Sequence, residues 1–147
     1  MNSRPSAERL TNSGLLLLRI GSGLSLALLF GLPKLSAAAA YLHTGQPWPF
    51  VDFNRKLGIP APVLIAYYQS LNESLVALVV ACGYYPRVAA LSLAIGFAAA
   101  TLCSLKVGEP SWLAAACYCL MFATILLTGP GRFSIDHLLK SRSKQNP

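Results

Sequence analysis

Charged side chains are scarce in this sequence, and acidic ones are the rarest. Of its 147 residues, 12% are charged and 5 are Asp or Glu, whereas about 25% of the residues in an average soluble domain are charged. The hydrophobic fraction is 54%, and a soluble fold of this length has too much surface to hide so many apolar residues. These values exclude an ordinary soluble domain and predict a protein surrounded by lipid.

Signatures of tightly bound cofactors are also missing. The two histidines, His43 and His137, lie outside the long apolar runs, so no histidine pair can hold a haem between membrane helices. The sequence contains no Cys-x-x-Cys pair, metal-ligand cluster or glycine-rich nucleotide loop. We therefore expect no haem, metal or nucleotide. Any redox chemistry needs a bound quinone, the cysteines or a partner subunit.

Four apolar runs dominate what is present, and they cover residues 14–32, 62–82, 88–105 and 111–128. Each approaches the roughly 20 residues that a helix needs to cross a bilayer. Pro33 and Lys34 close the first run, and short segments with Gly, Pro and a basic residue separate the others. Short connections make neighbouring helices antiparallel. We predict an all-α, integral membrane four-helix bundle of up-down topology, which forms a single membrane domain over residues 1–147.

Two short pieces are expected at the membrane surface. The first connection, residues 33–61, is long, and its aromatic side chains suit the membrane–water boundary. Within it, residues 35–42 are expected to form a short interfacial helix, either as a structured loop or as a ligand-facing lid. After the last run, Ser134 can cap a second short interfacial helix. The basic residues 140–147 are expected to form a disordered tail.

Basic residues indicate the orientation of the bundle. The net charge is +7, and it lies between and beyond the apolar runs, so we expect a lipid bilayer and no nucleic acid as partner. One side carries Arg4, Arg9, Arg87, Arg132, Lys140, Arg142 and Lys144, and the other carries Lys34, Arg55, Lys56 and Lys106. This excess predicts that both termini are cytoplasmic.

Arg19 and Glu73 are charged residues inside apolar runs. A single charge at the bilayer centre costs at least about 2.5 kcal/mol, and two opposite charges are tolerated when they pair. Counted from the inner ends of their runs, the two residues differ in depth by about 6 Å, which a long Arg side chain can span. We therefore predict an Arg19–Glu73 ion pair that faces the bundle interior.

Polar residues surround this predicted pair. Ser22 shares a helix face with Arg19, and Gln69 and Asn72 share one with Glu73, because residues three and four apart lie on the same side of a helix. The polar stripe either fixes helix register or lines a cavity for a proton or a quinone-type headgroup. In the second case Arg19 and Glu73 would be catalytic, and Gln69, Asn72 and Ser22 would bind the ligand.

The four cysteines, Cys82, Cys103, Cys117 and Cys119, all lie in or beside apolar runs. Cysteines in such positions are usually small apolar fillers. Cys103 and Cys117 lie on consecutive predicted helices near the same membrane face, at depths that differ by about 6 Å. The alternative is therefore that these two residues form a redox-active pair.

Several segments taken together resemble the DoxX family. They are residues 15–21 (LLLLRIG), 30–35 (FGLPKL), 57–62 (LGIPAP) and 83–91 (GYYPRVAAL), followed by the closing motif GPGRFSID with Gly129, Pro130, Gly131, Arg132 and Asp136. The resemblance covers about residues 14–139 and implies a four-span bundle. It implies a subunit either of a thiosulfate:quinone oxidoreductase or of a membrane complex linked to oxidative stress and thiol balance. Relatives often carry a histidine near the end of the third span, where residues 101–106 have none.

Two functions follow from these observations. The first is a quinone-linked redox or thiol-balance subunit in a bacterial-type cytoplasmic (inner) membrane, with a partner redox subunit or a second copy of the chain. The second is a non-catalytic membrane scaffold or assembly factor, whose buried ion pair is structural and whose outer loop binds a partner. Replacing Glu73 by Gln separates them, because turnover is lost in the first case and only stability in the second.

Overall fold

The structure is a computed structural model that describes residues 5–129 and 131–136, with side chains from residue 8 onward. Proline stands at the first position of α3, α4 and α6, where its fixed φ suits a helix start and its missing N–H is not needed. The elements are α1 (Pro5–Leu26), the π-helical segment η1 (Ala27–Gly31), α2 (Leu32–Thr44), α3 (Pro49–Lys56), α4 (Pro62–Leu71), the π-helical segment η2 (Asn72–Val76), α5 (Ala77–Cys82), α6 (Pro86–Lys106) and α7 (Trp112–Thr128).

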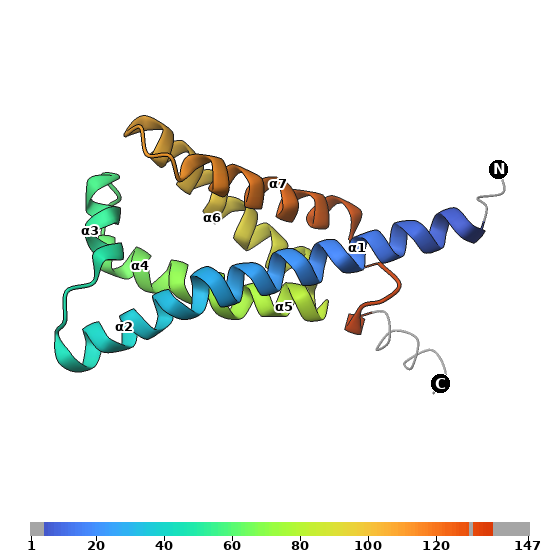
Figure 1. The fold of residues 1–147 in the computed structure, drawn as a ribbon, viewed down its shortest axis with the longest axis horizontal. Coiled ribbons are helices and arrows are strands. Elements are labelled where there is room, and N and C mark those ends of the chain that lie inside the picture. The colour runs from blue at the N-terminus through green and yellow to red at the C-terminus, as the bar shows by residue number, and fades with distance from the viewer. Residues whose placement is uncertain (1–4, 130, 137–147) are drawn as a thin grey trace.

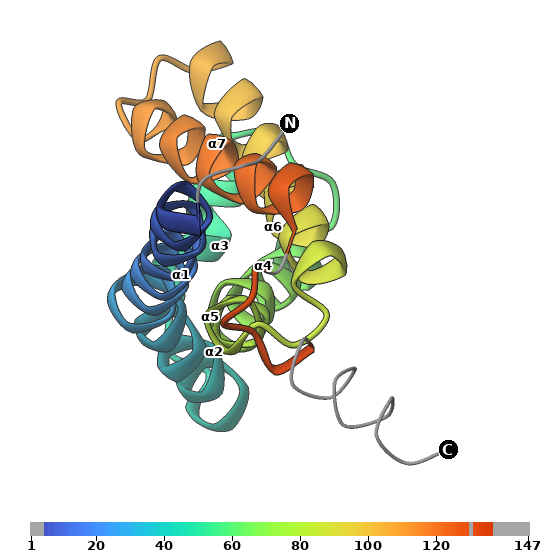
Figure 2. The ribbon, with the colours of Figure 1, turned by 90° about the vertical axis from the view of Figure 1, so that its right-hand side faces the viewer.

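These elements form four antiparallel rods. The stretch α1–η1–α2 is the first rod, α4–η2–α5 is the second, and α6 and α7 are the third and fourth (Figure 1). Seen from the end, the four rods surround a common interior (Figure 2). The α6–α7 hairpin packs near α1 and α5 and spreads away from α2 and α4 at the other end, where α3 lies (Figure 1). The bundle is therefore wider at the end that carries α3.

The first rod is longer than predicted. We expected a break at Pro33 and Lys34, and this expectation is wrong, because helical structure continues from Pro5 to Thr44. Proline usually breaks a helix because it lacks an N–H and its ring clashes with the carbonyl four residues earlier. Here Pro33 directly follows η1, whose wider turn changes the backbone hydrogen bonding before the proline. Residues 35–42 consequently belong to α2, and the separate short helix of this connection is α3.

The outer surface of the bundle is apolar, and polar side chains lie inside. Leu17, Leu102 and Leu127 are exposed, whereas Asn72 and Glu73 are buried. Such an arrangement suits a lipid solvent, in which polar groups turn toward the bundle interior. At 17 residues, α7 is at the lower end of the length that spans a bilayer. Within the described residues, the stretches long and apolar enough to cross a membrane are Glu8–Thr44, Pro62–Cys82 and Pro86–Lys106. The chain is therefore a multi-pass membrane protein.

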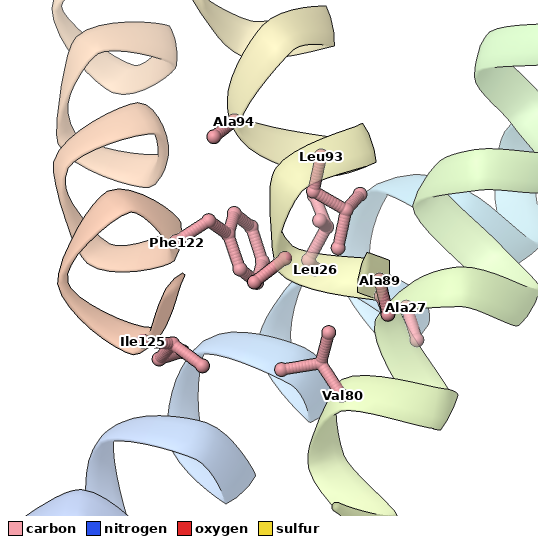
Figure 3. Close-up of a cluster of buried hydrophobic side chains, with 10 residues drawn as sticks. Leu26, Ala27, Val80, Ala89, Leu93, Ala94, Phe122 and Ile125 are labelled. Carbon is pink, nitrogen blue, oxygen red and sulfur yellow. The ribbon is translucent and has the colours of Figure 1, made fainter. Parts of the chain in front are cut away.

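Two apolar clusters hold the rods together. The larger one joins α1, η1, α5, α6 and α7, and Phe122 points from α7 toward Leu26 and Leu93 at its centre (Figure 3). The smaller one seats α3 against α2 and α4. In it, the buried Trp48 ring meets Tyr67 edge to face, with ring centroids 5.0 Å apart. The second cluster fixes α3 beside the interior of the wide end.

The two ends of the bundle are closed by different segments. At the wide end, Lys56 of α3 forms an ion pair with Glu109 in the connection between α6 and α7. At the opposite end, residues 131–136 run past α1 and the turn between α5 and α6. Ile135 and Asp136 are helical, but the rest of the expected C-terminal interfacial helix and the 140–147 tail lie outside the described residues.

Candidate functional site

The two π-helical segments face each other inside the bundle, and their backbones nearly touch. Gly31 is the last residue of η1, and a Cβ atom there would lie 2.5 Å from the carbonyl oxygen of Glu73 and 2.6 Å from Cα of Ser74. Only glycine allows so close an approach. π-helical turns are frequent at functional sites. The contact brings the residues that follow Gly31 to the same depth as Glu73.

Lys34 and Glu73 form an ion pair at this depth. The Lys34 Nζ atom lies 2.6 Å from Oε2 of Glu73, and both side chains are largely shielded from the outside of the bundle. The same Nζ atom lies 4.2 Å from the centroid of the Phe50 ring, which α3 contributes, and this is a favourable cation–π distance. Ionisable residues inside membrane bundles mark ligand or proton sites by default. The pair is therefore the centre of the candidate site.

A cavity of about 130 Å³ lies beside the ion pair. Every rod and α3 contribute to its walls, which are mostly apolar, with a few polar groups that point inward. The aromatic walls are Phe30, Phe50, Phe53, Phe97 and Tyr118, and the polar lining is Lys34, Asn54, Gln69, Glu73, Ser104 and Ser111. An apolar pocket with a few converging polar groups is the usual form of a small-molecule site.

Asn54 lines this cavity and carries a buried hydrogen-bond acceptor in its wall. Its side chain is fully buried, and its Nδ2 atom donates to Oε1 of Gln69 at 3.2 Å and to the carbonyl oxygen of Pro62 at 3.3 Å. Its Oδ1 atom has no hydrogen-bond partner among the described residues. A buried polar atom without a partner is costly, so a ligand or water that donates a hydrogen bond would stabilise this position.

The DoxX family model matches residues 14–104, which is more than half of the chain. The chain belongs to the DoxX family. No curated protein and no solved structure matches it. The matched range contains Lys34, Asn54 and Glu73, so the ion pair lies in the DoxX domain, whereas the cavity wall formed by Ser111 and α7 lies beyond the matched range. The closing motif at 129–136 lies beyond the matched range.

The predicted Arg19–Glu73 ion pair is wrong, because Glu73 pairs with Lys34 instead. Arg19 lies twelve residues before Gly31, about 18 Å along the helix at 1.5 Å per residue, whereas Gly31 is level with Glu73. The prediction counted depth from the ends of apolar runs, and the first helix extends well beyond its run in both directions. In this DoxX-family chain, Arg19 therefore lies toward one end of the bundle and outside the cavity lining.

Arg19 connects the first rod to the closing motif. Its guanidinium is buried and donates from Nη2 to the carbonyl oxygen of Phe133 at 2.7 Å. It also lies against Gly83, where a Cβ atom would be 2.8 Å from Cζ of the guanidinium. Gly83 has a φ of +73°, which L-residues adopt at a cost. Arg19 therefore connects the first rod to the closing motif and to the turn between α5 and α6.

The closing motif makes structural contacts at the same end of the bundle. The Arg132 N–H donates to Oδ1 of Asn12 at 3.0 Å, and the Asp136 carboxylate accepts from the N–H of Tyr85 at 3.2 Å. The Asp136 N–H also donates to the carbonyl oxygen of Gly83. Gly129 and Gly131 both have positive φ, and Pro130 lies outside the described residues. These contacts tie the segment after α7 to α1 and to the α5–α6 turn.

Of the three predicted ligand-binding residues, one lines the cavity and two do not. Gln69 lines the cavity and holds Asn54 in place. Asn72 instead bonds to α6, because its Oδ1 accepts from the Ser92 hydroxyl at 3.0 Å. Ser22 is buried but donates to the carbonyl oxygen of Leu18 in its own helix. The structure therefore brings Gln69 together with Glu73 at the cavity and leaves Ser22 outside its lining.

Cys103 and Cys117 are both free thiols. Ser111 donates to Ser104 and the Cys119 thiol donates to the carbonyl oxygen of Ala94, which fixes the register of α6 against α7. By this register Cys103 is level with the start of α7, and Cys117 lies about five residues further along, or about 7 to 8 Å. Because a disulfide needs Cα atoms within about 7 Å, these thiols could bridge directly only if the helices shifted.

Sequence reasoning missed Lys34, Asn54 and Tyr118 as site residues. Lys34 stands beside a proline at the end of an apolar run, and this position predicts a residue of an outer connection. Asn54 lies in a polar stretch between Phe53 and Arg55, where nothing distinguishes it from a surface residue. One signal was available, because Gly31 and Lys34 both fall in the FGLPKL segment that resembles the family.

Proposed function

We propose that this DoxX-family membrane protein is a quinone-linked redox or thiol-balance subunit of a membrane complex, and that the cavity at Lys34 and Glu73 binds the quinone ring. One observation carries the proposal: an opposite-charge pair that is largely shielded from the outside of the bundle lines an aromatic-walled cavity within the membrane domain. A non-polar ring that bears oxygen atoms matches both the apolar walls and the few polar groups. We place the protein in a bacterial-type cytoplasmic membrane with both termini cytoplasmic.

The dimensions and donor set of the cavity support a single six-membered ring. An apolar cavity of about 150 Å³ in another protein binds benzene, and the cavity here is of similar size, at about 130 Å³. The Lys34 ammonium can donate to a quinone carbonyl oxygen, and the Glu73 carboxylate can accept from the hydroxyl of a quinol. The residues present therefore fit both the oxidised and the reduced form of the ring.

Reduction of a quinone to a quinol consumes two electrons and two protons. In the proposed reaction a partner redox subunit supplies the electrons. The two protons come from water and reach the ring one after the other, and Glu73 is the carboxylate of the cavity that can pass each of them on beside the Lys34 ammonium. Lys34 also stabilises negative charge that develops on a ring oxygen. Cys103 and Cys117 remain candidates for the thiol-balance activity, each reacting as a separate thiol.

The test is binding of a short-chain benzoquinone to the purified protein in mild detergent, with extraction of any quinone that co-purifies. We expect Lys34→Met and Glu73→Gln each to weaken binding at least tenfold, because hydrogen bonds to charged groups contribute about 1.5–3 kcal/mol. The matched control is Glu109→Gln, which removes a carboxylate that lies outside the cavity lining. Equal affinity in the wild type and in both cavity variants would overturn the proposal.

A scaffold function is the second candidate, and one observation favours it. The Lys34–Glu73 pair, together with the Lys34–Phe50 contact, joins α2, η2 and α3, as a purely structural pair would do. A scaffold predicts that Glu73→Gln lowers stability in detergent, that no quinone binds the wild type, and that a partner protein co-purifies in mild detergent. Quinone retained by the wild-type protein would exclude this candidate.

A further inference from the structure

An apolar groove of about 330 Å³ runs between α4 and α6 on the outside of the bundle. Three isoleucines line it, Ile59, Ile65 and Ile95, and Ile95 is 62% exposed. Because the surrounding surface is also apolar, the groove opens toward the lipid rather than toward water. Any molecule that occupies it must therefore come from the membrane.

The floor of the groove is made of small residues. Gly96 and Ala100 of α6 lie there, and Ala99 lies beside them at the exposed edge. Small residues at such spacing usually let two membrane helices touch. Here α6 packs chiefly on α7, α5 and η2, while α4 packs on α2 and α3. The small residues thus leave open space between α4 and α6 instead of closing it.

The groove lies next to the cavity of the ion pair and shares wall residues with it. Gln69 and Ala100 line the cavity, the groove and a small void between them. Gly96 lines the groove and the void, and Glu73 lines the void and the cavity. Gly96 and Gln69 therefore stand between the lipid-facing groove and the ion pair, and a ligand that occupies both the groove and the cavity must pass between these residues.

We propose that this groove holds the hydrocarbon tail of a lipid-soluble quinone whose ring lies in the cavity, and that the ligand enters from the membrane between α4 and α6. The inference rests on the proposed function and names its substrate class, namely quinones with a long alkyl or isoprenoid tail. The cavity has room for one ring and no tail, whereas the adjoining groove has more than twice its volume and apolar walls. The apolar groove thus suits the hydrocarbon tail, and the cavity with its few polar groups suits the ring.

The experiment compares two probes in the purified full-length protein in lipid nanodiscs. One probe is a decyl-substituted benzoquinone, and the other is the same ring with a methyl group in place of the decyl chain. Gly96→Leu fills the floor of the groove, and Gly96→Ala is its matched control, because a Cβ atom there meets its nearest neighbour, Nδ2 of Asn72, at an ordinary 3.5 Å. Ala99→Leu narrows the groove from an exposed position that cannot disturb the bundle interior.

We expect Gly96→Leu and Ala99→Leu to weaken binding of the decyl probe about tenfold, equivalent to about 1.4 kcal/mol, and to change binding of the methyl probe less than twofold. Gly96→Ala should leave both affinities unchanged. If both probes bind the wild type and the two leucine variants change neither affinity, or change both alike, the groove inference is wrong and the proposed ring site stands. If neither probe binds the wild type, the proposed function fails and the groove inference fails with it.

Discussion

The Lys34–Glu73 pair makes a quantitative prediction about stability. At an N···O distance of 2.6 Å and an effective dielectric constant of about 20, the gross Coulomb attraction is about 6 kcal/mol. Desolvation of both groups offsets much of it, and the Lys34 side chain keeps 24% exposure against 10% for Glu73. Removing one partner of a buried pair costs about 3–5 kcal/mol, since it leaves a buried charge uncompensated. We expect Lys34→Met or Glu73→Leu alone to cost about 3 kcal/mol.

The double variant should cost much less than the sum of the two single variants, because an apolar replacement of both charges is often nearly neutral. The assay is equilibrium unfolding in mixed micelles with increasing SDS, analysed as a double-mutant cycle. The Lys56–Glu109 pair is the control, because its lysine is well exposed and such pairs contribute about 0–1 kcal/mol. A coupling energy for Lys34 and Glu73 no larger than that of the control pair would refute the reasoning.

Two glycine predictions test the packing around the site and the bundle end. Gly31→Ala should destabilise the protein by about 1–3 kcal/mol in thermal unfolding in detergent, because its methyl group overlaps the backbone of η2. In the same assay the control Gly21→Ala should be neutral or stabilising, because the space around Gly21 is open. Gly83→Ala should increase hydrogen exchange in residues 131–136, because its methyl group would displace the Arg19 guanidinium. Gly45→Ala has a similar positive φ but no neighbour, so it carries only the backbone cost of about 1–2 kcal/mol. Equal effects of Gly83→Ala and Gly45→Ala on that exchange would contradict the role given to the guanidinium contact.

Apolar run length was a reliable guide for three of the four rods. The helical stretch Pro62–Cys82 coincides with the second run, and α6 and α7 lie within two residues of the third and fourth. These runs end at Gly and Pro, which act locally and can be read directly from the sequence. The first rod differs from its predicted bounds because the effect of Pro33 on the helix depends on the π-helical turn before it. Nothing in the local sequence specifies that turn.

The candidate site was predicted in part. Glu73 and Gln69 line the cavity, as a polar stripe inside an apolar run suggested. The predicted partner of Glu73 was wrong, because the pairing of two side chains depends on the depth at which their helices meet. That depth is set by the contact between Gly31 and the backbone of η2, on another rod. Asn54 enters the site through the docking of α3, which Trp48 and its neighbours determine.

The sequence by itself determined that the chain is a helical membrane protein of the DoxX family, because hydrophobic run length and local breakers are properties of neighbouring residues. Only the tertiary structure decided which charges meet and where a cavity lies. These features depend on the relative depth of separate helices, and that depth is fixed by side-chain and backbone contacts between residues about forty positions apart, such as Gly31 and Glu73. The same contacts turned Lys34 from an expected loop residue into the partner of Glu73.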